Sequence, residues 1–302
     1  MGFNTALFLQ LVWAGLTAGA LYAVVAFGFC LVYYTSRVLH FAHGAVVILL
    51  SYVIYTLVTS GGLWWPIAAL VAVPIGVLLG ATIELAVYRP VRRRARHGDL
   101  PAQALFMASL GIGLMIVNVI PLVYGTSPKF LPGGILANAI LVWHDQVALS
   151  YIGLVAIPAS IALIFALMLW LRVTPTGKTI RAVIDNPETS RIVGLNVERT
   201  NLVALCLGSA LATGGAIFLI ASRGADSQAN NLMIVIIAVA LIGGIGSLEG
   251  VLVAAFLVGL ASNVALLWLP TSLGDSVIYV FLLLVITFRP KGLFGHITAK
   301  RA

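Results

Sequence analysis

The sequence contains very little charge. Only 9% of its 302 residues are Asp, Glu, Lys or Arg, against roughly 25% in a soluble domain. Hydrophobic residues make up 61%, and the mean hydropathy is +1.11. This composition excludes a soluble enzyme or binding module. Apolar runs of about 20 residues recur along the chain, and each is long enough to cross a bilayer as a helix. We therefore expect an all-α, polytopic membrane protein.

Cysteine and histidine are also scarce. Cys30 and Cys206 each lie inside an apolar run, which favours packing over disulfide formation. A metal site needs three or four ligands at workable spacing. His97, His144 and His296 fall in loops or in the tail, with no Cys/His cluster near them. We expect neither a disulfide nor a metal site.

Motifs for catalysis and ion coupling are missing as well. There is no G-x-x-x-x-G-K-[ST] loop, because "TPTGKT" (174 to 179) is preceded by Arg172 where a glycine would stand. The serines do not group with His or Asp as a nucleophile and base would. Only Glu84 and Glu249 lie near apolar sequence, so an ion-coupled secondary transporter is the less favoured alternative. We expect no enzyme and no cofactor in this chain.

The basic residues are concentrated in three segments. The formal net charge is +8, and fourteen of the 17 Lys and Arg residues lie in 88–99, 172–199 and the tail after Phe288. The positive-inside bias places all three segments in the cytoplasm. A nucleic-acid face would need one contiguous soluble surface, which this chain does not offer.

The apolar runs predict nine crossings, within a range of eight to ten. The first residues lack a basic region, so we expect no cleavable signal peptide. An odd number of crossings places the N-terminus outside and the C-terminus in the cytoplasm. We expect a single transmembrane domain covering 1–302. The segment 231–243 is short and could be re-entrant. The predicted spans are 7–34, 45–59, 64–88, 102–124, 151–171, 200–221, 231–243, 249–268 and 275–288.

Two small-residue stretches interrupt apolar sequence, one in each half of the chain. They are "FAHGA" (41 to 45) and "GGIGSLEGV" (243 to 251). Unwound backbone at membrane depth is tolerated where it is buried in protein or lines a cavity, and paired breaks indicate a translocation path. The predicted path or gate residues are His40, Phe41, His43, Gly44, Gly243, Gly244, Gly246, Ser247 and Glu249.

His40 and His43 lie three residues apart, so they face the same side of a helix. A metal site is disfavoured because no further ligands lie nearby in the sequence. A proton relay is disfavoured because the spans contain few acidic residues that could take part. Two interpretations stay open. Either both rings bond backbone carbonyls freed at the start of a helix, or they belong to a gate.

A short cytoplasmic helix is predicted within the loop 172–199. Asn186-Pro187 is a helix-start signal, Glu188 suits the positive helix N-terminus, and Gly194 can end the helix after about two turns. A loop of this length usually has a function.

The chain resembles, almost end to end, the membrane subunits of ATP-binding-cassette importers of the branched-chain (hydrophobic) amino acid permease family. "LHFAHG" (39 to 44) is similar to the "NFAHG" signature, with His40 in place of asparagine. "VYRPVRR" (87 to 93) and "GGIGSLEG" (243 to 250) resemble two further motifs, with Glu249 in place of proline. "FRPKGLFG" (288 to 295) matches the C-terminal motif.

The resemblance implies several partners. These are a second, similar permease subunit, two cytoplasmic ATPase subunits that bind ATP and Mg, and a periplasmic solute-binding protein, all acting by alternating access in the inner membrane. The solute would be a branched-chain amino acid or another small apolar compound; urea, short amides and aromatic acids are alternatives. Glu188 to Gly194 resembles the coupling segment that contacts the ATPase. The predicted coupling residues are Arg181, Glu188, Arg191, Ile192, Gly194 and Leu195.

Overall fold

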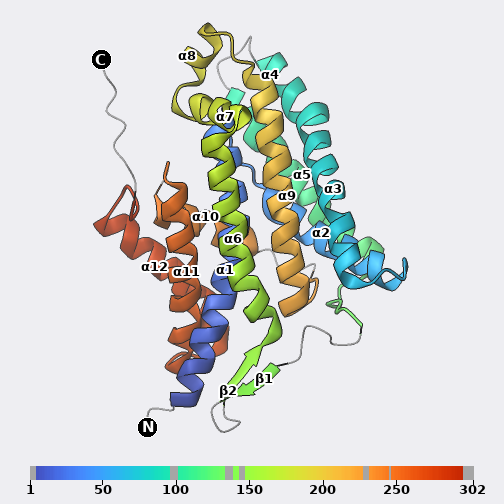
Figure 1. Ribbon diagram of the computed structural model, residues 1–302, viewed down its shortest axis with the longest axis vertical. Coiled ribbons are helices and arrows are strands. Elements are labelled where there is room, and N and C mark those ends of the chain that lie inside the picture. Colours follow the sequence, from blue (N-terminus) through green and yellow to red (C-terminus); the bar gives the residue numbers. More distant parts are fainter. Residues whose placement is uncertain are drawn as a thin grey trace. The chain divides into compact units, whose positions relative to one another are not determined.

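The computed structural model is built mainly of long helices, with one small β-hairpin among the described residues (Figure 1). The structure describes residues 5–95, 101–132, 139–142, 147–226, 231–244 and 246–294. Within these residues, eight segments are long and apolar enough to cross a membrane. The all-α, multi-span prediction is therefore confirmed.

The helices coincide with the predicted spans. The 13 residues of the shortest one cover about 20 Å, less than the roughly 30 Å of a hydrocarbon core. The bounds are α1 Thr5–Ser36, α2 Ala42–Thr59, α3 Trp65–Ile83, α5 Pro101–Tyr124, α6 Tyr151–Val173, α9 Val197–Arg223, α10 Asn231–Gly243, α11 Leu248–Val264 and α12 Gly274–Phe288.

Short elements connect or extend these helices. The third span runs from α3 through a π-helical turn into a basic helix, α4, and two short helices fill the loop before α9. A π-helical turn inside a long helix often marks a functional position. The short elements are η1 Glu84–Tyr88, α4 Arg89–Ala95, α7 Pro175–Asp185, α8 Pro187–Ile192, η2 Ala265–Leu267 and η3 Thr271–Leu273.

The contacts divide the chain into two compact units. Unit 1 comprises Met1–Phe27, Gly134–Ile161 and Ile234–Ala302, and unit 2 comprises Gly28–Gly133 and Ala162–Met233. Three helices, α1, α6 and α10, therefore contribute residues to both units.

Small residues hold the helices of unit 2 together. A methyl group at Gly76 or Gly80 of α3 would overlap the side chain of Thr213 or Ser209 on α9. Close approach of backbones is the main way in which helices associate in lipid, where no hydrophobic force acts between them. The glycines of α3 therefore fix its packing against α9.

Unit 1 uses the same principle. A Cβ atom at Gly15 of α1 would lie 2.9 Å from the carbonyl oxygen of Gly259 on α11, and one at Gly19 would lie 2.9 Å from the Cα of Phe256. The first helix of unit 1 therefore packs backbone to backbone against α11.

The β-hairpin lies in the segment predicted to be an outer loop. Strands β1 Ala139–Val142 and β2 Val147–Ser150 pair antiparallel, with Ala139 opposite Ser150. The indole Nε1 of Trp13 donates a hydrogen bond of 3.3 Å to Ser150 Oγ. The sequence analysis did not predict this hairpin, because two four-residue strands are too short to show a periodic pattern.

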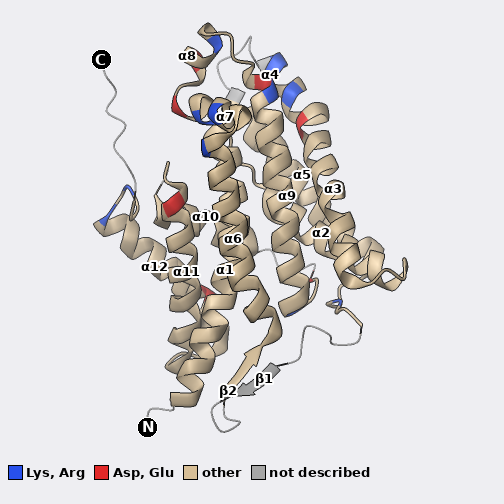
Figure 2. Cartoon of the chain, viewed as in Figure 1, with Lys and Arg blue, Asp and Glu red and all other residues tan. Residues whose placement is uncertain are grey.

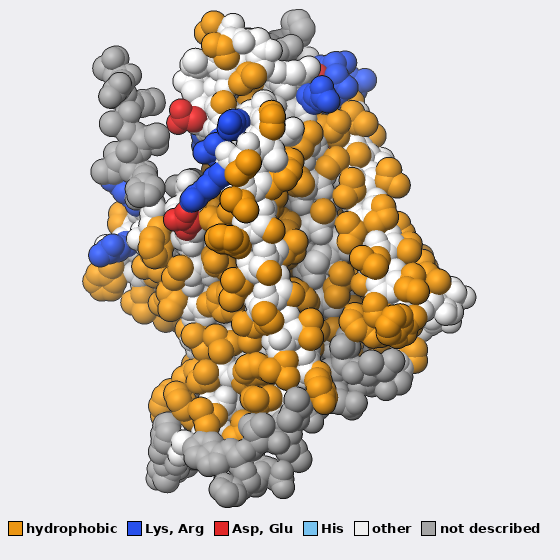
Figure 3. Space-filling view, in the orientation of Figure 1, with side chains coloured by type: hydrophobic (Ala, Val, Ile, Leu, Met, Phe, Trp, Pro, Cys, Tyr) orange, Lys and Arg blue, Asp and Glu red, His pale blue; other side chains and the backbone are white. Residues whose placement is uncertain are grey.

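Large apolar side chains cover the outer faces of the helices. Leu78 on α3, Leu122 on α5 and Phe165 on α6 are each more than 60% exposed, and hydrophobic atoms dominate the visible helix surfaces (Figure 3). In unit 2 most arginines gather where α4, α7 and α8 lie, at the start of α9 (Figure 2). An apolar belt that ends in a basic rim is typical of a membrane-spanning unit. This end of unit 2 is called the basic end below.

Candidate functional site

The predicted break at "FAHGA" separates α1 from α2 within unit 2. α1 ends at Ser36, Arg37 adopts a left-handed backbone with φ of 57°, and α2 begins at Ala42. A non-glycine residue in this region is uncommon and marks a specific turn. The break covers residues 37–41, so only Phe41 of the predicted stretch belongs to it, and residues 42–45 already form the first turn of α2.

A histidine–tyrosine pair fixes this break. His40 Nδ1 lies 2.6 Å from Tyr88 Oη, a hydrogen-bond distance, and Tyr88 belongs to the π-helical turn η1. The His40 and His43 rings lie edge to face, with centroids 5.6 Å apart. The partner of His40 Nδ1 is thus a hydroxyl and not a backbone carbonyl, which corrects one of the two interpretations of this residue.

Both histidines are completely buried, with an exposed fraction of 0%. His43 packs against Phe29 of α1, and the peptide N–H of His43 donates to the His40 carbonyl at 3.0 Å. Burial and the neighbouring His43 hold the pKa of His40 well below 6.5, so that its ring is neutral. In the part of the chain that the structure describes, no three His, Cys, Asp or Glu side chains gather as metal ligands.

Ser109 of α5 bridges the same break. Its Oγ accepts a hydrogen bond from the Ala42 peptide N–H at 3.3 Å and donates one to the Leu39 carbonyl at 3.2 Å. Phe41 packs edge-on against Phe106, also on α5. The unpaired backbone groups where α2 starts are thus partly satisfied by a neighbouring helix.

Gly44 allows a close approach in the first turn of α2. A Cβ atom there would lie 2.9 Å from Met233 Cβ and 3.2 Å from Met233 Cα. A larger residue at position 44 would therefore push α10 away at Met233.

The second predicted break separates α10 from α11 in unit 1. Gly243 ends α10, and Gly244 and Gly246 have φ of 101° and 103°, values that L side chains rarely adopt. Ser247 caps α11, since its Oγ accepts a 3.0 Å hydrogen bond from the Gly250 peptide N–H. Glu249 lies exposed in the first turn of α11, where the helix dipole favours a negative charge.

The C-terminal "RPKGLFG" motif packs on this second break. The Leu293 N–H donates to the Ile242 carbonyl at 2.8 Å, and the Phe294 N–H donates to the Gly243 carbonyl at 3.2 Å. Gly292, with φ of 78°, lies directly against Gly244. The free carbonyls at the end of α10 are thus satisfied by the chain terminus. The predicted path residues 40–44 belong to unit 2, and the predicted path residues 243–249 belong to unit 1.

The predicted short helix of the loop 172–199 is present as α8. Asn186 Oδ1 accepts hydrogen bonds from the N–H groups of Glu188 and Thr189, each at 3.0 Å, and Gly194 ends the turn with φ of 85°. Ile192 is 85% exposed and Val193 is 68% exposed. The sequence analysis missed the preceding helix α7, whose start is marked by Thr174 before Pro175.

Backbone hydrogen bonds attach α7 to its neighbours. Arg37 donates to the Ile184 carbonyl at 2.7 Å, and Arg181 donates to the Arg172 carbonyl at 3.2 Å. Arg181 is one of the predicted coupling residues, and its guanidinium holds α7 to the end of α6. Leu195 is half-buried, and its N–H donates to the Ser190 carbonyl at 2.9 Å.

Ion pairs fix the basic end of α3 and α4. Arg89 and Arg93 bond Glu198 of α9 at 2.9 and 3.1 Å, and Arg92 pairs with Glu84 inside the π-helical turn. Glu84 is almost completely buried, and a buried carboxylate needs such a partner. The arginine run in the sequence indicated charge on this side, but it did not indicate which residues pair.

The family of the chain follows from its sequence as a whole. A family model described as the permease component of a branched-chain amino acid transport system matches residues 11–286. The chain belongs to this family. The matched region includes both breaks and α8. The permease is therefore a multi-pass protein of the inner membrane and a translocation subunit of an ATP-binding-cassette transporter.

Individual relatives agree over nearly their full length. The permease is 26% identical to the high-affinity branched-chain amino acid transport system permease protein LivH of Escherichia coli (strain K12), over 96% of each chain. It is equally similar to the protein BraD of Pseudomonas aeruginosa, which carries the same description. A probable branched-chain amino acid transport permease of Methanocaldococcus jannaschii is 25% identical, over 85% of this chain and 80% of that one.

A solved structure supports the fold. PsaBC from Streptococcus pneumoniae, in complex with Fab, matches with a TM-score of 0.50 at 13% identity, over 94% of this chain and 92% of the matched chain. At this level of identity the likeness concerns the arrangement of helices alone.

Proposed function

We propose that the permease moves a small, largely apolar solute into the cell, with branched-chain amino acids as the first candidates. Its relatives carry that substrate in their names. The proposal includes a second permease subunit, two cytoplasmic ATPase subunits that bind ATP and Mg, and a periplasmic solute-binding protein. It also places the N-terminus outside and the basic end of unit 2 in the cytoplasm.

The observation that carries the ATPase partnership is the exposed apolar tip of α8. Ile192 and Val193 project at the basic end of unit 2, beyond the spanning part of α9. Large apolar side chains on a polar connecting segment are costly unless a partner covers them. An apolar centre surrounded by charged groups, here Glu188 and Arg191, is the usual composition of a protein–protein contact.

The attachment of this loop to the helices supports a mechanical role. Asn186 caps α8, Arg181 holds α7 to the end of α6, and Arg37 holds α7 to the turn after α1. A displacement of α8 by an ATPase would therefore act on the turn that precedes His40. Under this proposal, alternating access begins at the break between α1 and α2.

The test compares two glycines with the same backbone geometry. Gly194 and Gly125 have φ of 85° and 78°, and a Cβ atom at either would meet nothing within 4 Å. Gly125 follows the last residue of α5, about 36 Å along that helix from its basic end. Gly194→Trp and Gly125→Trp are therefore matched in strain, while only Gly194→Trp alters the proposed docking surface.

The measurement is stimulation of ATPase activity by the solute-loaded binding protein in reconstituted complexes. We expect Gly194→Trp and Ile192→Asp to lose most of the stimulation or to release the ATPases, while Gly125→Trp keeps both. Equal stimulation in all three variants, with the ATPases still bound, would refute the docking role of α8. Uptake of labelled leucine compared with urea, together with ligand binding by the partner solute-binding protein, tests the solute class separately.

A further inference from the structure

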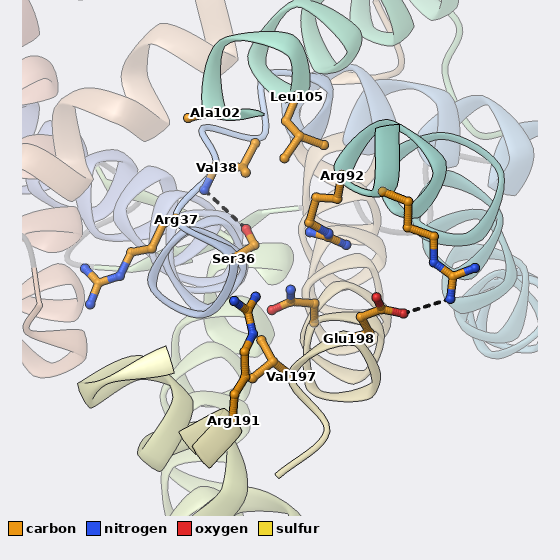
Figure 4. Close-up of a pocket in the computed structure, with 11 residues that line it drawn as sticks. Ser36, Arg37, Val38, Arg92, Ala102, Leu105, Arg191, Val197 and Glu198 are labelled. Atoms are coloured by element: carbon orange, nitrogen blue, oxygen red, sulfur yellow. Dashed lines mark hydrogen bonds and ion pairs between the residues drawn. The ribbon is translucent and has the colours of Figure 1, made fainter. Parts of the chain in front are cut away.

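A pocket lies at the basic end of unit 2, beside the turn that follows α1. Its volume is about 280 Å³, and its walls come from the end of α1, from α4, from the start of α5, from α8 and from the start of α9 (Figure 4). Four arginines and one carboxylate line it. Spanning helices end here, so the pocket lies at the level of the membrane surface.

The pocket has an excess of positive charge. The carboxylate, Glu198, is already shared by Arg93 and Arg89, and Arg92 is paired with Glu84. Arg37 donates to a backbone carbonyl. Among the described residues no carboxylate pairs with Arg37 or Arg191. Two positive charges in the walls therefore lack a counter-ion.

Two arginines are directed into the same space. Arg92 from α4 and Arg191 from α8 extend toward the interior of the pocket, whereas Arg37 points away from it (Figure 4). Nε and Nη1 of Arg92 are buried and have no hydrogen-bond acceptor among the described residues. Arginine pairs well with phosphate, because its planar fork of N–H donors matches the oxyanion.

Asn201 adds a second, independent observation. Its side chain lines the pocket, only 6% of its surface is exposed, and its Oδ1 has no donor within the described part of the chain. A buried polar atom without a partner costs about 1–3 kcal/mol. A phosphate alone would satisfy the arginines, but Asn201 Oδ1 requires a hydroxyl or another N–H donor.

We propose that this pocket binds a phosphate oxyanion that carries a hydroxyl group, held by Arg92 and Arg191 with the hydroxyl donating to Asn201. Two sources share this chemistry: the headgroup of phosphatidylglycerol and hydrogen phosphate from solution. Basic pockets between helices at the cytoplasmic side of a membrane commonly bind anionic headgroups. Occupancy would join α4, α8 and α9 through one ligand.

The test uses the full-length permease, delipidated in detergent and titrated with lipid in mixed micelles. Bound lipid is counted by native mass spectrometry, with phosphatidylglycerol and phosphatidylcholine in one arm and inorganic phosphate in the other. We expect one saturable phosphatidylglycerol site that phosphatidylcholine does not fill. Competition by millimolar phosphate would assign the site to the soluble anion, and its absence would assign the site to the lipid.

Three variants make the assignment specific. Arg191→Gln should weaken binding about tenfold or more, as expected for the loss of a charge-assisted hydrogen bond. Arg199→Gln removes the same charge from an exposed position outside the pocket, so it should leave binding unchanged. Asn201→Asp places a carboxylate in the pocket and should abolish binding.

The thermal midpoint of Asn201→Asp distinguishes a specific loss of binding from misfolding. The added carboxylate supplies a counter-ion for the arginines, so it should not lower the midpoint. The proposal is overturned if the wild-type protein binds neither phosphatidylglycerol nor phosphate selectively. It is equally overturned if Arg199→Gln weakens binding as much as Arg191→Gln. The readout is independent of ATPase docking, so failure here would leave the proposed function intact.

Discussion

The two breaks in the permease are built by different means. The break after α1 is made of side chains: His40 bonds Tyr88, and Ser109 reaches across from α5. The break after α10 is made of backbone: glycines at positive φ turn the chain, and the C-terminal segment bonds the end of α10. A side-chain junction can lose one hydrogen bond at a time, whereas at the second break a Cβ atom added to Gly243 or Gly292 would overlap backbone atoms. The two breaks should therefore respond differently to substitution.

The largest effect is expected where backbone meets backbone. Gly292→Val adds a side chain at φ of 78° directly against Gly244, so strain and overlap combine. We expect a loss of about 2–4 kcal/mol and little folded protein. The measurement is the monodisperse peak of the solubilised permease in size-exclusion chromatography. Gly125→Val is the control for backbone strain alone, since φ of Gly125 is also 78° and its surroundings are open. An equal loss of folded protein in both variants would show that the packing of Gly292 against Gly244 does not contribute.

At the first break the corresponding test is Gly44→Leu. The new side chain would overlap Met233 at the start of α10, because a Cβ atom alone comes within 2.9 Å of that residue. We expect a loss of about 1–3 kcal/mol, seen as a lower thermal midpoint, and a reduced uptake rate. Gly111→Leu on α5 is the matched control, since a Cβ there meets nothing within 4 Å. If both substitutions lower the thermal midpoint equally, close packing around Gly44 is not the cause of the lost stability.

The sequence predicted both breaks but not their construction. Long apolar runs identify spans because a fixed thickness of hydrocarbon dictates their length, and glycine clusters identify turns because few other residues tolerate positive φ. The contacts of Tyr88 with His40 and of Leu293 with Ile242 join segments about 50 residues apart in the sequence. No local periodicity encodes such pairs. The resemblance to a permease family identified the motifs, but it did not show that "GGIGSLEG" and "FRPKGLFG" contact each other.

The loop 172–199 shows the same limit. Asn186, Pro187 and Gly194 predicted α8 because capping and termination are local effects. The pocket beside α8 could not be predicted, since its walls come from five helices. The basic run around Arg92 indicated positive charge at this end, and only the fold shows that Asn201 lies beside it.

The third prediction concerns the buried histidine–tyrosine pair. Tyr88→Phe removes the hydroxyl that lies 2.6 Å from His40 Nδ1 and leaves a buried nitrogen without a partner. We expect a loss of about 1–2 kcal/mol. Tyr55→Phe on α2 is the control, because no hydrogen bond of its hydroxyl occurs among the described residues. Equal thermal midpoints for Tyr88→Phe and the wild type would show that the pair does not stabilise the break.

The same pair predicts a dependence on pH. The pKa of His40 is held well below its ordinary value near 6.5, so the folded protein binds fewer protons in mild acid than the unfolded chain does. Stability is then fully present above pH about 6.5 and falls as the pH drops below that value. His40→Asn, which cannot titrate, should flatten the curve of thermal midpoint against pH between about 6.5 and 5. A wild-type curve that is already flat over this interval would contradict the neutral state of His40.

The smallest effect is expected at the caps, where the two breaks can be compared directly. α11 is capped from its own chain by Ser247 Oγ, and α2 is capped from α5 by Ser109 Oγ. Ser247→Ala should cost about 1 kcal/mol, but Ser247→Gly only a few tenths, because glycine is itself tolerated as an N-cap. Ser109→Ala loses two hydrogen bonds and separates α5 from the break, so it should cost more than Ser247→Ala and should also lower the uptake rate. Ser276→Ala, at an exposed position on α12, is the control for both. The decisive quantity is the difference in thermal midpoint between Ser109→Ala and Ser247→Ala. If Ser247→Ala lowered the midpoint more, the break after α10 would depend on its helix cap, and not on its glycines and the C-terminal segment.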